Sequence, residues 1–344
     1  MPGNPTFKES EHPRGKGGEF INKNATVRPV AGHSKDPLPA QDEADLQDEI
    51  RTHVKENGRL DHEGLTMVLD DIEAEQAAID MKDPKIDEQL AGCERISVAH
   101  ALELADRHTG TTRDRIRINL LANPLTHKAP QVKNRMMEII DRTRDGKRKA
   151  EYMGSYCLNP LTTPGEQTTM CLRAKEYPGI VCRGVVDSRN ANDQSLRMAV
   201  ISCRDEDVKA AALRNPHAGE DTVRAVAGTT IDRYTLNAAM QHDACPSDAV
   251  DTVIKRGEQY RKNRDDHNAH DMFNIASHAK RMTAEQAEQL IRNDPDNRDV
   301  ARGVWLHAPK EAMPTIRRIE RQYPDLAKTP VEPRHKHHGI FDKH

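Results

Sequence analysis

Apolar and polar positions in this chain follow the period of an α-helix, in short runs separated by corners. In residues 208–228 two apolar sets flank the dipeptide Asn215-Pro216. Proline disfavours the helical conformation of the residue before it, so the first helix is expected to stop at Asn215. Glu220 and Asp221 then suit the first turn of a second helix, where exposed N–H groups favour negative charge. The stretch predicts two short helices joined at a proline corner.

The same pattern recurs along most of the chain. Corners are expected near positions 58, 94, 124, 160, 189, 216, 243, 280 and 309, with a base spacing of about 27–29 residues and a few insertions of about eight. One such unit has an apolar side on each helix and is too small to bury either side alone. The pattern therefore predicts an all-α fold, an α-solenoid of about nine degenerate helix–corner–helix repeats.

Three corner segments carry a family resemblance. They read N-P-L-T-T-P-G-E at 159–166, L-R-N-P-H-A-G-E-D-T-V at 213–223 and L-H-A-P-K-E-A-M-P-T-I at 306–316. They resemble the leucine-rich repeat variant family over about 115–322. The resemblance implies a right-handed superhelix in which an α-helix alternates with a shorter, often 3₁₀, helix.

This chain departs from the family pattern in two ways. Its repeat is longer than the family's period of roughly 24 residues, so we expect both helices to be α-helical, as in HEAT-like repeats. Some members of the family bind an iron–sulfur cluster through an N-terminal group of cysteines, but no cysteine precedes Cys93 here. We therefore predict no cofactor.

Composition divides the chain into three parts. Residues 1–40 have few large apolar side chains and are predicted to be a disordered tail, and residues 326–344 a flexible, histidine-rich tail. The solenoid is expected over 41–325, with acidic first units at 41–110 and clearer repeats at 115–322. The segment 12–20 (H-P-R-G-K-G-G-E-F) resembles tails of actinobacterial phage or plasmid proteins, which suggests an accessory protein of a mobile element as one alternative.

Charge and cysteine content narrow the class of protein. Aromatic residues make up only 3% of the chain and the formal net charge is -3, so the whole chain is not a nucleic-acid binder on charge alone. No apolar run is long enough to span a membrane and no secretory signal is recognisable, so we expect a cytoplasmic protein. None of the six cysteines lies in a C-x-x-C pair, which argues against zinc. We expect them to be reduced and buried.

Two basic insertions are the candidate binding residues. Both follow the second helix of their units, so a solenoid would place them along one edge, where they could contact phosphate or an acidic partner. The alternative is that they are solvated loops or helix extensions, balanced within the molecule by the acidic residues at 41–80. The candidates are Arg142, Arg144, Lys147, Arg148, Lys149, Lys255, Arg256, Arg261, Lys262 and Arg264.

No enzymatic motif is recognisable by spacing. His270, Asn274 and His278 would share one helix face, but no second group of ligands matches them, so we predict neither a metal site nor catalysis. Solenoids offer extended binding surfaces, and a protein or peptide partner is our first hypothesis for function. Nucleic-acid binding along the basic edge is the second. A helical-repeat enzyme acting on nucleic acid is the third, disfavoured by the scarcity of aromatic residues.

Overall fold

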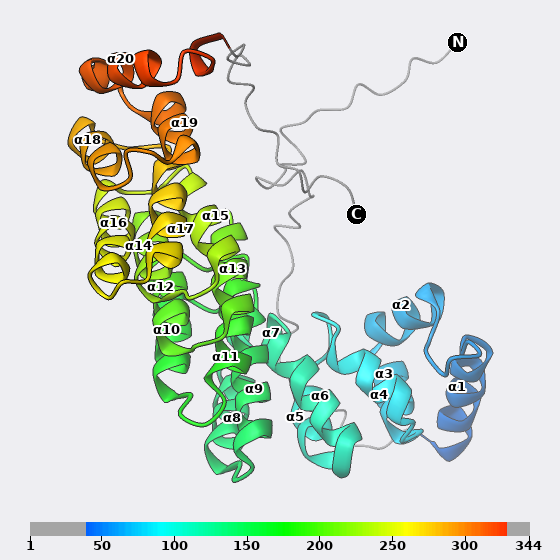
Figure 1. The fold of residues 1–344 in the computed structure, drawn as a ribbon. Helices are drawn as coiled ribbons and strands as arrows, with labels where there is room; N and C mark the ends of the chain where they lie inside the picture. Colours follow the sequence, from blue (N-terminus) through cyan, green and yellow to red (C-terminus); the bar gives the residue numbers. More distant parts are fainter. Residues whose placement is uncertain (1–38, 329–344) are drawn as a thin grey trace, which may run out of the picture. The chain divides into compact units, whose positions relative to one another are not determined.

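The computed structural model describes residues 39–328, and these are mainly helical (Figure 1). No strand occurs in this range, only an isolated bridge between Val54 and Leu60. No helix of the same range is long and apolar enough to cross a membrane. The predicted tails, apart from their residues 39–40 and 326–328, lie outside the described residues.

The chain divides into two compact units, residues 1–139 and 140–344. In the first unit α3 packs on α1 and α2, and α6 packs on α4 and α5. Its interior includes Ile50, Val68, Ile79 and Leu90, all fully or almost fully buried. The helices are α1 (Ala40–Thr52), α2 (His62–Asp70), α3 (Ile72–Asp80), α4 (Pro84–Ala91), α5 (Val98–Arg107), α6 (Gly110–Ala122), α7 (Leu125–Lys128) and α8 (Pro130–Arg142), which contains the boundary.

The second unit is built from successive helix pairs. Each helix packs on its partner in the pair and on the next helix but one, so odd-numbered and even-numbered helices form two layers (Figure 1). The helices are α9 (Gly146–Leu158), α10 (Pro164–Arg173), α11 (Pro178–Val186), α12 (Asp193–Ser202), α13 (Glu206–Arg214), α14 (Glu220–Thr229), α15 (Arg233–Gln241), α16 (Ser247–Lys262), α17 (Asp266–Ser277), α18 (Ala284–Asn293), α19 (Arg298–His307) and α20 (Met313–Gln322), with short 3₁₀ helices at Lys310–Ala312 and Leu326–Lys328.

Each of the nine predicted corners falls between two helices, and both helices of nearly every pair are α-helical as predicted. Local sequence explains where the helices begin. Asp205, Asp232 and Thr283 each accept a hydrogen bond from a backbone N–H in the first turn of the helix that follows. The additional break at Asp71, within the acidic stretch, is not predicted. Asp71 caps α3 in the same way.

Buried asparagines hold the corners together. The Asn215 carbonyl oxygen accepts a hydrogen bond from the His217 N–H (3.0 Å), while its amide donates to the carbonyls of Val186 (2.9 Å) and Ser188 (3.2 Å) in the preceding pair. Asn123 makes the equivalent bonds in the first unit, and Asn159 accepts from Leu161. The prediction that the helix before Asn215 ends there is confirmed, since α13 ends at Arg214. Asn123 and Asn215 also tie one repeat to the one before it.

Small residues let the helices of one layer approach closely. A Cβ atom added at Gly184 of α11 would lie 2.3 Å from the carbonyl oxygen of Gly154 in α9. The other buried residues of α9 and α11 are mostly Val, Ala, Cys and Met, with Tyr152 and Tyr156 as the largest side chains. Such thin, closely spaced layers agree with the low aromatic content of the chain.

Candidate interaction surface

The even-numbered helices of the second unit run parallel, so their C-terminal ends lie along one edge. At their N-terminal ends, Asp193 of α12 binds the first turn of α14, and Gln286 of α18 donates to the Ser247 carbonyl at the start of α16 (2.7 Å). The opposite ends must therefore also be neighbours. We call the side where α10, α12, α14 and α16 end the distal edge.

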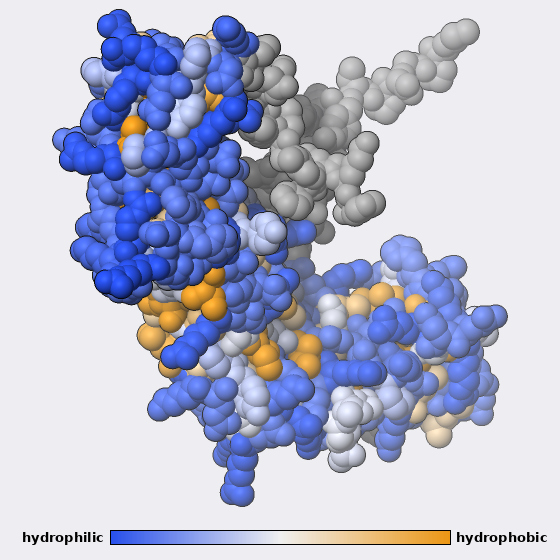
Figure 2. Space-filling view, viewed as in Figure 1, coloured by the Kyte–Doolittle hydropathy of each residue, from blue (hydrophilic) through white to orange (hydrophobic). Residues whose placement is uncertain are grey.

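Large apolar side chains are exposed along the distal edge. Leu172 near the end of α10 is 64% exposed and Ile201 near the end of α12 is 46% exposed. Beyond α14, Ile231 is 89% exposed and Tyr234 is 88% exposed. Apolar surface is visible over α10 and α12 in the space-filling view (Figure 2). Single exposed apolar residues are common on protein surfaces, whereas several of them along one edge are typical of interaction sites.

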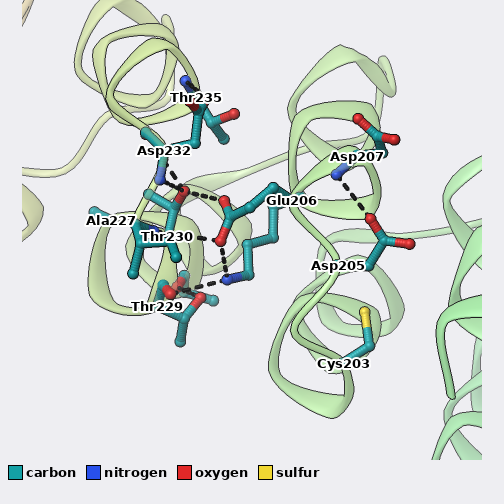
Figure 3. Close-up of polar contacts among 12 residues, drawn as sticks. Cys203, Asp205, Glu206, Asp207, Ala227, Thr229, Thr230, Asp232 and Thr235 are labelled. Atoms are coloured by element: carbon teal, nitrogen blue, oxygen red, sulfur yellow. Dashed lines mark hydrogen bonds and ion pairs between the residues drawn. The ribbon is translucent and has the colours of Figure 1, made fainter.

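Glu206 at the start of α13 holds the loop that carries Ile231, and its bond to the adjacent Thr230 is drawn in Figure 3. The Glu206 carboxylate accepts hydrogen bonds from the Thr230 hydroxyl, the Ile231 N–H (3.3 Å) and the Lys209 ammonium group (2.8 Å). Lys209 is buried, and it also donates to the Thr229 carbonyl (2.8 Å). Burial opposes ionisation of Glu206, but the bonds from Lys209, Thr230 and Ile231 hold its pKa below the ordinary value.

Further bonds fix both ends of the same loop. Arg256 of α16 donates to the carbonyl of Ala227 (2.8 Å), in the last turn of α14, and to the carbonyl of Thr230 (2.9 Å), which follows α14. Asp232 caps α15 by accepting from the Thr235 N–H (2.7 Å), and bonds from Thr235 lower the pKa of Asp232. The backbone of 229–232 is therefore ordered, while the Ile231 side chain points into solvent.

Residues 141–149 lie beside the end of α10, since Arg173 pairs with Asp141, and residues 255–264 include the end of α16. Neither insertion is a long loop. Residues 141–149 comprise the end of α8, a short connection and the start of α9. Residues 255–264 are mainly the last turns of α16, which is extended to 16 residues. Of the interpretations considered from the sequence, a helix extension describes the second insertion.

Some of the predicted basic residues are engaged within the protein. Arg256 binds the end of α14, and Arg261 pairs with Asp294 (3.4 Å) while its guanidinium lies 5.0 Å from the centre of the Phe273 ring. Lys149 donates to the Asp141 carbonyl at 3.5 Å, and Arg142 and Arg148 have other interactions. Arg256 and Arg261 thus have structural roles that the sequence did not reveal.

The remaining predicted cations are exposed. Within residues 39–328 they form no side-chain hydrogen bond or ion pair, although Lys255 and Lys262 contribute to lowering the pKa of Glu258. They lie at the two ends of the row of exposed apolar residues, beside α9 and at the end of α16. These residues are Arg144, Lys147, Lys255, Lys262 and Arg264.

His270 of α17 and His278, which follows this helix, have ordinary structural partners. His270 Nδ1 lies 2.6 Å from Asp294 Oδ2, and His278 Nδ1 lies 2.8 Å from the Asn274 carbonyl oxygen. Among residues 39–328, no group of three or more His, Cys, Asp or Glu side chains could hold a metal ion. Five of the six cysteines are buried and Cys93 is half-buried, all as free thiols. Burial raises the pKa of the Cys245 thiol to about 12.

Comparisons with known proteins give no relative for this chain. No family model matches it, and neither curated proteins nor solved structures contain a significant match.

Proposed function

We propose that residues 140–328 form an α-solenoid whose distal edge binds a segment of a partner protein. The observation that carries this proposal is the exposure of Ile231 and Tyr234 on a loop whose backbone is fixed by Glu206 and Arg256. A loop whose backbone is already ordered before binding loses little backbone entropy when a partner covers the side chains that it carries. Exposed apolar and aromatic anchors of this kind dominate the energetics of protein interfaces.

The solenoid part of this proposal is supported by helix packing and by the corners. Each helix packs on the next but one, and Asn215 bonds to the preceding pair, which is how stacked repeats share a continuous core. The N-P corner segments support kinship with leucine-rich repeat variant or HEAT-like proteins. Six of the nine predicted corners fall within residues 140–328. The count of about nine repeats over residues 41–325 and the right-handed sense remain part of the proposal, as does a role without enzymatic activity.

Selection from a displayed library of random peptides against the full chain tests the binding function. We expect enriched peptides with apolar anchors that bind the unaltered protein. Changing Ile231 and Tyr234 together to Ser should weaken that binding at least tenfold. Tenfold corresponds to about 1.4 kcal/mol, which is a lower limit because a strong interface anchor contributes more. The matched control is Ile72→Ser, since Ile72 is 40% exposed but lies in the first unit. Equal binding by the double variant would reject the site.

Nucleic-acid binding is the second candidate function. The exposed cations Arg144, Lys147, Lys255, Lys262 and Arg264 favour it, because phosphate contacts come mainly from Lys and Arg. Fluorescence anisotropy of random-sequence DNA and RNA at several salt concentrations tests it. Binding that weakens steeply with salt and is lost when these five residues become Ala would support this function. Absence of binding at low salt would reject it.

A further inference from the structure

The last α-helix of the described chain, α20, carries three arginines on one exposed face. Arg317 and Arg321 are one turn apart and Arg318 lies three residues before Arg321, so the three side chains are neighbours on the helix surface. All three are exposed, whereas Thr315 and Ile319 of the same helix are buried where α20 packs on α18 and α19. We call these three arginines the arginine face.

The arginine face is not neutralised in the part of the chain that the structure describes. None of its arginines forms an ion pair there, and one guanidinium donates through Nε to the main chain of its own helix (3.2 Å). In the surrounding segment 310–328, Asp325 is paired with Arg298, which leaves five cations and two carboxylates, Glu311 and Glu320. The remaining formal charge is five minus two, or +3. Like charges so close repel each other, and an anionic partner would remove that repulsion.

The first helix of the described chain, α1, carries the opposite charge in a similar arrangement. Asp42, Asp45 and Glu49 recur at i, i+3 and i+7, so they form one stripe along the helix, and all three are exposed. Within the described residues none of them pairs with a cation, although one accepts a hydrogen bond from a neighbouring glutamine (2.9 Å). The one basic residue of α1, Arg51, pairs with Asp48 instead. We call these three carboxylates the acidic stripe.

We propose that the arginine face of α20 binds the acidic stripe of α1 in a second copy of this chain. The two surfaces match in charge, three guanidinium groups against three carboxylates, and each extends over one to two turns of a helix. Each contact leaves one α1 and one α20 free, so the association is head-to-tail and can continue to further copies. α20 contains no aromatic residue on which a base would stack, which favours a protein segment over a single-stranded nucleic acid. The contact does not depend on the function proposed for the distal edge.

Sedimentation velocity of the full chain at rising protein concentration, at low and at high salt, tests the proposal. Exposed ion pairs are individually weak and are screened by salt, so we expect self-association at low salt that is lost at high salt. Two charge-reversed variants, Arg317→Glu with Arg321→Glu on α20 and Asp42→Arg with Asp45→Arg on α1, should each lose it. An unaltered chain that stays monomeric at low salt, or a variant that associates like the unaltered chain, would overturn the proposal.

Mixing the two charge-reversed variants shows whether the contact joins separate copies. Alone, each variant has like charge on α1 and α20, but in the mixture every surface finds one of opposite charge, so association should return. The control, Lys255→Glu with Lys262→Glu, makes the same charge change on α16 as the α20 variant and should associate like the unaltered chain. A mixture that stays monomeric, or loss of association in the control, would overturn the proposal. Salt-dependent binding of random duplex DNA that only the α20 variant loses, without self-association, would assign the arginine face to nucleic acid instead.

Discussion

The ion pair of Glu206 and Lys209 shows at the residue scale how the exposed loop is kept in place. The Lys209 side chain is 4% exposed and that of Glu206 is 27% exposed, so the two charges do not depend equally on each other. Without Glu206, Lys209 would be a buried cation with only the Thr229 carbonyl as acceptor. Without Lys209, the Glu206 carboxylate would stay partly hydrated and would keep its hydrogen bonds from Thr230 and Ile231.

This asymmetry predicts unequal effects of substitution. We expect Glu206→Gln to lower the free energy of unfolding by about 3 kcal/mol, because an unpaired buried charge is costly. Lys209→Met should lower the free energy of unfolding by about 1 kcal/mol, since this substitution removes hydrogen bonds but leaves no buried charge unpaired. Urea denaturation followed by circular dichroism measures both. A larger loss for Lys209→Met would show that the pair is not arranged as described.

His242 occupies a corner position that is asparagine at 123, 159 and 215, and its surroundings predict that stability depends on pH. Its Nδ1 accepts a hydrogen bond from the Ala244 N–H (3.1 Å), which only the neutral ring can do. Burial lowers the pKa of His242, against the opposing effects of Asp243 and a hydrogen bond to the Leu213 backbone. The unfolded chain therefore binds the proton more tightly, so stability is fully present above about pH 6.5 and declines as the pH falls below it.

Replacing His242 by Asn separates this effect from other titrations. Asparagine makes the same turn at 215, so His242→Asn should keep its stability at pH 7.5 and lose less than the unaltered protein between pH 6.5 and 5. Thermal unfolding across this pH range provides the measurement. Identical pH profiles for the two proteins would mean that His242 does not titrate on folding.

At the scale of single helices, α14 begins in an unusual way because its cap comes from another repeat. Its own N-cap residue is Gly219, which has no side chain to accept a bond. Asp193 of α12 replaces it, accepting from the N–H groups of Gly219 (2.8 Å), Asp221 (3.0 Å) and Thr222 (2.9 Å). Burial opposes ionisation of Asp193, but the bonds from Thr222, Gly219 and Asp221 keep its pKa below the usual value.

Glycine at 219 is required by this close approach. A Cβ atom there would lie 2.5 Å from Asp193 Oδ2, so Gly219→Ala should displace the carboxylate and destabilise the protein by about 1–2 kcal/mol, as the loss of a helix cap does. Gly228→Ala is the matched control, because no atom lies within 4 Å of its added Cβ, and it should be neutral or stabilising. Chemical denaturation compares them, and equal stability of the two variants would contradict the proposed role of Asp193.

Helices and corners were predictable because their signals are local. Asn-Pro pairs, acidic first turns and apolar spacing act within a few residues, and each predicted corner lies between helices. The cap from Asp193 to Thr222 and the bonds of Arg256 to α14 join residues 26 to 29 positions apart. The sequence does not show which repeats are neighbours. From the sequence alone, Arg256 could therefore be predicted only to be a surface cation. The exposure of Ile231 could not be predicted either, because an apolar residue beside a helix is expected to be buried.

At the scale of the whole described chain, the distal edge of the second unit exposes Ile231 and Tyr234. A partner bound through this edge should be insensitive to salt, because apolar contacts are not screened.

The most direct measurement compares two labelled ligands, a peptide selected by the full chain and a random single-stranded DNA, by fluorescence anisotropy at low and high salt. The proteins compared are the unaltered chain, Ile231→Ser with Tyr234→Ser, and Ile72→Ser. If the distal edge binds a protein segment, the peptide binds the unaltered chain and the Ile72 control alike at both salt concentrations and is released by the double variant. Peptide binding that survives in the double variant, or steeply salt-dependent binding of the DNA alone, would contradict the proposed function.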